Sequence, residues 1–358
     1  MTRNAITALT LALSPQVPLS KTRLETLCLL IVAMISARTV NLSHLACERG
    51  GHVQVSSTYR RLQRFFQHVA LPEDWSARLV IQLIGLTGPC HLCLDRTNWK
   101  IGKRDVNILM LAVTTRRFRV PLMWTVLDRV GSSNTEERIA LMRRYLAMFG
   151  AESIRLLLAD REFIGLKWLN FLDRNGISFA IRVKAGMNVR TEDGRSLSLR
   201  SLLAKCRGAR KFRATFLSQG DVKGLTLTFA AKRIKGGELL IVASNATDQN
   251  ILNAYRRRWS IECLFGDTKT RGLNLEDTRL QIATKLSLLL AIIALAVAWI
   301  NKIASALIGT GKLKRKTHGY YAKSWFRTGF DEVRRLLRSD TNAATRPWLQ
   351  FSKRQRVV

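Results

Sequence analysis

Residues 255–269 read YRRRWSIECLFGDTK and carry an unusual set of side chains. No proline interrupts them and good helix formers are frequent, so the segment predicts a helix with Gly266 as its one weak position. Because a helix turns by roughly 100° per residue, four side chains fall within about 60° on one face: Tyr255, Arg258, Glu262 and Lys269. A helix face that packs in the core would be apolar, whereas this face carries a carboxylate, two cations and a phenol. Such a set of side chains suits a site that holds a metal ion and phosphates together.

The chain as a whole is strongly basic. Its 358 residues include 59 Lys and Arg against 25 Asp and Glu, which gives a formal charge of +34. Because a compact protein with this charge repels itself, a polyanionic partner is expected, and nucleic acid is the first candidate. A generally basic surface, as on a ribosome-associated protein, is the alternative. The length allows two or three domains and a sizeable core.

Two features bear on the compartment. Residues 1–18 lack the charged start and long apolar run of a secretory signal, and the cysteines stand singly except Cys90 and Cys93, so a reducing cytoplasm is expected. Residues 286–300 are strongly apolar, but a membrane span needs about 20 residues. A buried core helix is the better interpretation, and no membrane partner is expected.

Residues 1–85 are expected to form a helical region. Apolar periodicity predicts helices at 21–38 and 42–49, with Asn41 as the cap of the second helix and a glycine pair at its end. A third helix is predicted at 58–69.

This third helix has Ser56 or Ser57 as its expected cap and carries basic side chains opposite its apolar side. The basic residues, which are candidate DNA contacts, are Arg60, Arg61 and Arg64. Helix, glycine turn and basic helix resemble a DNA-binding helix-turn-helix arrangement. A small helical bundle with a solvated basic face remains an equal alternative.

The pattern then changes to alternating strands and helices. Strands are predicted at 91–95, 106–115, 118–127, 153–160 and 177–183, with a turn at Arg116-Arg117 and helices at 135–149 (capped by Asn134) and 164–175. The run at 154–159 is continuously apolar, as in a strand covered on both faces. The expected fold class is therefore α/β, with a mixed sheet.

Residues 186–250 interrupt this alternation. They are rich in Gly, Lys and Arg, and contain predicted strands at 213–217, 225–231 and 239–244. They indicate a β-rich insertion before the helix at 255–269. Beyond the apolar helix, residues 306–358 form a basic, helical C-terminal region.

Three acids stand out by position. Asp95 is expected to end the first strand and Asp160 the fourth, while Glu262 lies on the later helix. Sites in α/β sheets are built at strand ends. Two carboxylates from neighbouring strands and a third from a packed helix can hold two Mg²⁺ ions about 4 Å apart, which activate a water for phosphodiester cleavage. A single acid at a strand end is more often a solvated turn residue.

The order of these acids resembles that of the RNase H-like DDE transposases of bacterial insertion sequences. The helix matches their signature Tyr-x2-Arg-x3-Glu-x6-Lys at the four positions quoted above, and Trp259 beside Arg258 also fits. Residues 158–163 resemble the segment around the second acid of the family, and 94–95 the first. The resemblance covers roughly residues 90–300.

The resemblance implies an RNase H-like core at 86–185 and 251–305. Asp95, Asp160 and Glu262 would be the catalytic residues and would ligate two Mg²⁺ or Mn²⁺ ions. Further DNA contacts would come from Tyr255, Arg258, Trp259 and Lys269. The implied reaction is cut-and-paste transposition by a homodimer: water cleaves at the terminal inverted repeats, and the freed 3′-OH attacks target DNA. An inactive DNA-binding derivative, or another RNase H-like nuclease, is the alternative.

Several other polar residues are expected to have ordinary roles. Glu162 should pair with a nearby cation. Asp267 lies about 140° around the helix from Glu262 and should face elsewhere, and Asp128 should be a turn residue. Cys90-His91-Leu-Cys93 has the gap of a zinc half-site without a second pair, so core packing is expected there and also for Trp124.

Overall fold

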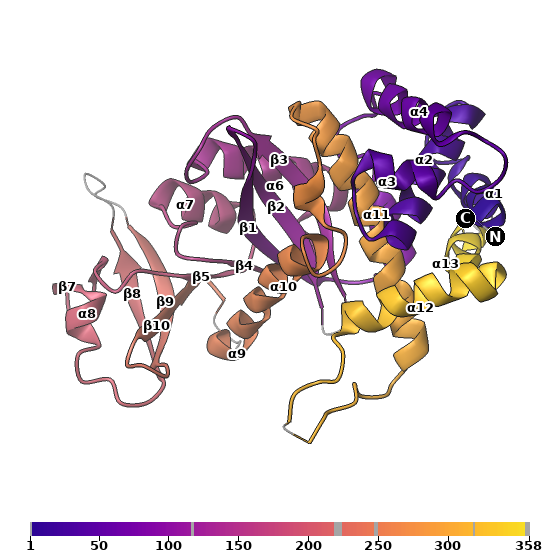
Figure 1. The fold of residues 1–358 in the computed structure, drawn as a ribbon. Helices are drawn as coiled ribbons and strands as arrows, with labels where there is room; N and C mark the ends of the chain where they lie inside the picture. The colour runs from indigo at the N-terminus through magenta and orange to yellow at the C-terminus, as the bar shows by residue number, and fades with distance from the viewer. Residues whose placement is uncertain (1, 116–117, 218–223, 247–249, 318, 355–358) are drawn as a thin grey trace.

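The computed structural model describes residues 2–115, 118–217, 224–246, 250–317 and 319–354. The turn expected at Arg116-Arg117 lies outside the described residues. Within them, a central sheet carries helices on its faces, and a helical body stands beside one end of the sheet (Figure 1).

The sheet has ten strands in the described residues, in the order β3-β2-β1-β4-β5-β10-β9-β8-β6-β7. Its first half comprises β1 (Cys90–Ile101), β2 (Arg104–Thr114), β3 (Arg119–Leu127), β4 (Ile154–Ala159) and β5 (Phe179–Arg182). The first three strands form an antiparallel meander, and β4 runs parallel to both β1 and β5. The predicted mixed α/β sheet is confirmed, and its order is consistent with an RNase H-like fold.

Strand β1 is longer than expected, so the prediction that Asp95 ends it is wrong. The strand continues to Ile101 because β2 pairs with all of it except Cys90, from His91 opposite Thr114 to Ile101 opposite Arg104. The pairing with β4 stops earlier, at Leu94 opposite Ala159. Asp95 is therefore the first residue of β1 beyond β4.

The insertion extends the same sheet. Its elements are β6 (Asn188–Arg190), β7 (Ser196–Ser198), α8 (Leu199–Leu202), β8 (Arg210–Phe216), β9 (Leu225–Arg233) and β10 (Leu239–Ser244). The three predicted strands are confirmed as β8, β9 and β10. Strand β10 pairs antiparallel with β5, with Ser244 opposite Ala180. The insertion thus projects from the β5 side of the core, away from the helical body (Figure 1).

The segment at 255–269 is not one uninterrupted helix. It comprises the end of α9 (Ile251–Tyr255), a 3-10 turn (Arg256–Arg258) and α10 (Trp259–Thr268), and Lys269 follows α10 with φ −89° and ψ −135°. Such turns are common at helix junctions. Helices α6 (Thr135–Phe149) and α7 (Leu166–Arg174) were predicted, and Asn134 caps α6 in a reciprocal capping box with Glu137.

The N-terminal helices are α1 (Thr2–Leu13), α2 (Lys21–Ala37), α3 (Leu42–Cys47), α4 (Val55–His68) and α5 (Ala77–Ile84). Asn41 caps α3 as predicted, its side chain accepting from the Ser43 amide at 3.1 Å. The cap predicted for α4 is wrong: α4 begins one turn earlier, with Gln54 at the cap position. Apolar periodicity does not reveal this start, because the apolar residues Val53 and Val55 are exposed instead of facing the core.

The predicted apolar helix is α11 (Ala283–Ile308), which is longer than expected. By length and composition it could cross a membrane, but 78% of its most apolar window is buried within the protein. It packs against β3, α2, α5 and α12 (Trp325–Ser339), which accounts for its composition as a core helix. The last helix, α13 (Thr341–Arg354), packs against α1, so the two ends of the chain lie close together (Figure 1). Short 3-10 turns occur at Ala151–Ser153 and Leu275–Asp277.

Candidate active site

Asp95 and Asp160 lie side by side at the edge where β4 stops. Leu94 is the parallel partner of Ala159, and the next residue on each chain is the aspartate. Because neighbouring strands lie about 4.8 Å apart, this register places two carboxylates next to each other. Both residues are half-buried.

Glu262 joins this pair through Arg258. The Arg258 guanidinium lies 3.3 Å from Oδ2 of Asp95 and also forms an ion pair with Glu262, one helical turn further on. The Arg258 side chain is 13% exposed. The 3-10 turn and α10 therefore present Arg258 and Glu262 to β1, and the cation lies between an acid of the sheet and an acid of the helix.

The electrostatic environment of Asp95 disfavours its charge. Burial, reinforced by Asp160 and Glu162, raises its pKa to about 6, although the Arg96 amide and Arg258 act in the opposite direction. A buried carboxylate with other acids beside it gains from a nearby cation.

Tyr255 completes the cluster from the end of α9. The residue is 6% exposed, and its hydroxyl has no hydrogen-bond partner in the described part of the chain. Burial raises the pKa of the phenol, so it stays protonated and remains a donor. An unpaired buried donor beside Arg258 suits an incoming anion such as a phosphate.

The donor atoms fit a hard divalent cation. In the described residues no three His, Cys, Asp or Glu side chains already form a group that could hold a metal ion. However, Oδ1 of Asp160 is buried without a hydrogen-bond partner, and the neighbouring acids present only oxygen donors. Mg²⁺ prefers such oxygens.

The family model described as a transposase DDE domain matches residues 86–299, more than half of the chain. The chain belongs to the DDE transposase family. This match covers the five core strands, the insertion, and helices α9 and α10, and it implies DNA as the class of substrate. A search of the curated proteins returned no match.

The remaining residues of the transposase signature lie apart from the acid cluster. Lys269 donates to the Asn98 carbonyl at 3.1 Å, pairs with Glu276 at 2.8 Å and lies 5.5 Å from the centre of the Trp99 ring. It is thus anchored on β1 beyond Asp95, because the chain leaves the helical path at this residue. Trp259 is 64% exposed.

The expected ordinary roles of the other acids are confirmed. Glu162 forms a bidentate ion pair with Arg96, at 2.8 and 3.1 Å. Asp267 faces Arg119 at 3.2 Å. Exposed Asp128 lies after β3, 3.3 Å from Arg104.

The core assignments are confirmed as well. Cys90 and Cys93 are buried, and burial raises the pKa of each thiol, to about 11 and about 12. Trp124 is buried and donates to the Ser287 hydroxyl at 2.8 Å.

Sequence reasoning missed the contact between His91 and Arg257. His91 is 6% exposed, and Arg257 lies 2.7 Å from its Nε2. Burial, with Arg257 and Arg155, lowers the pKa of the imidazole to about 4, so the ring is neutral and accepts. The three consecutive arginines at 256–258 could have indicated such a contact. Their side chains point in different directions, so only one of them can reach the acids and the others need different partners.

The three N-terminal arginines also differ from one another. Arg61 donates to the Thr26 hydroxyl at 2.7 Å and to the Thr22 carbonyl at 2.8 Å, so it ties α4 to α2. Arg60 and Arg64 are exposed. Of the candidate DNA contacts on α4, these two are therefore the accessible ones.

Proposed function

We propose that this transposase carries out cut-and-paste transposition: it binds the terminal inverted repeats of its insertion sequence, hydrolyses a phosphodiester at each end and joins the freed 3′-OH to target DNA. The observation that carries the proposal is the register that sets Asp95 beside Asp160, with Glu262 linked to Asp95 through Arg258.

The proposed cofactors are two Mg²⁺ or Mn²⁺ ions held by Asp95, Asp160 and Glu262. The free Oδ1 of Asp160 and the raised pKa of Asp95 support this assignment, because both gain from a cation. When bound, the ions supply an activated water and neutralise charge on the reacting phosphate. Arg258 is then released from the carboxylates and is available to a DNA phosphate.

The other signature residues are proposed to position DNA. The free Tyr255 hydroxyl donates to a phosphate at the reacting end. Lys269 and Trp259 contact the flanking DNA, Trp259 through its exposed ring. The helical region at 1–85 binds the repeats, the β-rich insertion at 186–250 and the C-terminal region at 306–358 support the DNA, and two copies pair the ends in a cytoplasmic, nucleoid-associated complex.

Incubation of the purified chain with a plasmid that carries its gene and flanking DNA tests the proposal. With Mg²⁺ or Mn²⁺, cuts at the two borders of the element are expected, and with EDTA none. Binding at the borders without cleavage in either metal would instead identify an inactive DNA-binding derivative. Cuts elsewhere would identify a different RNase H-like nuclease.

A further inference from the structure

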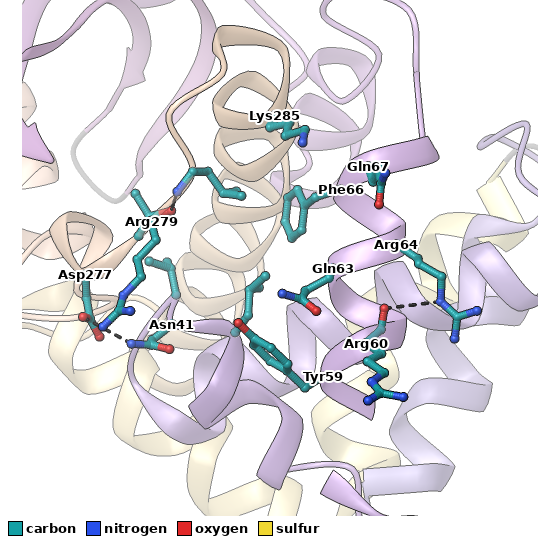
Figure 2. A pocket seen from close by; sticks show the side chains of 14 residues that line it. Asn41, Tyr59, Arg60, Gln63, Arg64, Phe66, Gln67, Asp277, Arg279 and Lys285 are labelled. Atoms are coloured by element: carbon teal, nitrogen blue, oxygen red, sulfur yellow. Dashed lines mark hydrogen bonds between the residues drawn. The ribbon is translucent and has the colours of Figure 1, made fainter. Parts of the chain in front are cut away.

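A groove of about 700 Å³ separates helix α4 from the segment that leads from α10 into α11 (Figure 2). One wall is the exposed side of α4. The other wall comes from residues 277–285, which lead from the site into α11. We call it the α4 groove. Its two walls lie far apart in the sequence, one in the expected end-binding region and the other within the segment matched by the DDE family model.

The α4 wall presents a row of long polar side chains. Arg60, Gln63, Arg64 and Gln67 follow one another at helical spacing and are all exposed, whereas the opposite side of α4 is buried. Figure 2 shows Gln63 extending toward the second wall, with Arg60 and Arg64 on the other side of α4. A glutamine amide can donate to and accept from the edge of adenine in the major groove. Two glutamines with arginines beside them are therefore suited to recognise base edges of duplex DNA.

The second wall contributes two more cations, Arg279 and Lys285. Neither these two cations nor Arg60 and Arg64 at the outer side of α4 form an ion pair with an acid in the ranges that the structure describes. Asp277 is the single acid among the described lining residues, and it accepts from Thr39 Oγ1 at 2.8 Å and from Asn41 Nδ2 at 3.4 Å. Asp277 therefore ties the second wall to the start of α3, and the groove keeps an uncompensated positive charge.

We propose that the α4 groove holds one edge of duplex DNA at the transposon end. Gln63 and Gln67 read base edges, and Arg279 and Lys285 bind phosphates of the same duplex from the catalytic half of the protein. This inference rests on the proposed function and deepens it. Residues 277–285 follow α10 after a short connection, residues 269–276, and Asp277 ties them to the start of α3. A duplex seated in the groove is therefore fixed relative to Glu262.

Binding of the full chain to short duplexes tests this inference. The probes are duplexes tiled from the DNA that flanks the gene and a shuffled duplex of the same composition, each at several salt concentrations. The double variant Gln63→Ala/Gln67→Ala should lose between about fivefold and about 150-fold of the preference for the end duplex. Its affinity for the shuffled duplex should stay unchanged.

Arg279→Ala should behave differently, since a phosphate contact carries no sequence information. The variant should bind both the end duplex and the shuffled duplex more weakly, and the slope of log affinity against log salt should fall by about one. Matched controls are Gln82→Ala on α5 and Arg174→Ala on α7, which remove an exposed glutamine and an exposed cation elsewhere. Neither should change preference or slope.

The failures are distinguishable. If the unaltered chain prefers its end duplex and both groove variants keep its preference and slope, the inference about the groove is overturned and end binding stands. If the unaltered chain shows no preference for any flanking duplex, end recognition itself is wrong. Gln63→Glu serves as a second variant if the alanine variants unfold, because it keeps a polar surface and must still reduce binding.

Discussion

Arg258 is the residue on which the acids of this site depend. In the structure it neutralises Asp95 from one side and Glu262 from the other, at a position where a divalent cation would do the same. Side-chain spacing predicted that Arg258 and Glu262 share a face. It could not predict that Arg258 reaches Asp95, because that contact depends on how the 3-10 turn sits on β1.

Asp95→Asn should stabilise the protein in EDTA while removing activity. The pKa of Asp95 in the folded state lies at about 6, above its ordinary value of 3.8. Between these two values the folded state holds a proton that the unfolded chain has lost. Stability therefore falls as pH rises from about 4 to about 6. Removing the charge should recover on the order of 1–2 kcal/mol at about pH 7 and nothing below about pH 4.

Urea unfolding of the two proteins across this pH range measures the effect. Asp128→Asn is the control, since its side chain is 95% exposed and its pairing with Arg104 is on the surface. A less stable Asp95→Asn protein at neutral pH would show that Asp95 is held by favourable contacts and not strained by burial.

At the scale of elements, the family signature is spread over α9, the 3-10 turn, α10 and the residue after α10 instead of one helix. Propensity favoured a continuous helix, and the break at Arg256–Arg258 lacks a local signal because none of these residues is a helix breaker. The extension of β1 did leave a signal. Thr97, Trp99 and Ile101 alternate with Asn98 and Lys100, a strand pattern that continues past Asp95.

Substitution of Arg61 should affect the stability of the protein, whereas substitution of Arg64 should affect its DNA binding. Arg61→Ala removes the contacts to Thr22 and Thr26 on α2 and should lower the free energy of unfolding by about 1 kcal/mol. Arg64→Ala should leave the free energy of unfolding within about 0.5 kcal/mol.

Arg64→Ala should instead lower the salt slope of DNA binding by about one. Thermal unfolding and anisotropy titrations of both variants measure these effects. The same loss of stability in both variants would mean that Arg64 also packs in the fold.

At the scale of the whole molecule, the order of elements was predictable and their long-range packing was not. The acid order and the strand-helix alternation predict the core sheet. The sequence does not show that the insertion joins this sheet through β10 and β5, or that α13 packs on α1. Both depend on contacts between residues distant in the chain, which periodicity does not encode.

The helical body also limits one simple experiment. Deletion of residues 1–85 would be the direct test of end recognition, but α2 and α5 pack on α11, the most apolar helix of the core. Their removal would expose that helix, so we expect the truncated chain to aggregate. Size-exclusion chromatography checks this, and a soluble, monodisperse truncated chain would show that the helical region is a separable domain.

The excess of positive charge should dominate DNA binding by the full chain. With a formal charge of +34, affinity for a shuffled duplex should fall about 10³-fold or more between about 50 and 200 mM salt. Equilibrium titrations over this range provide the measurement. Affinity that barely changes with salt would contradict a binding mode based on phosphate contacts.

Cleavage of an end-bearing duplex by isosteric acid variants tests the central claim most directly. Asp95→Asn, Asp160→Asn and Glu262→Gln should each lower the cleavage rate in Mg²⁺ by at least about a thousandfold. Each should leave binding of the duplex in EDTA within about twofold, since all three keep the shape of the side chain. Full cleavage by any one variant would remove that residue from the catalytic site.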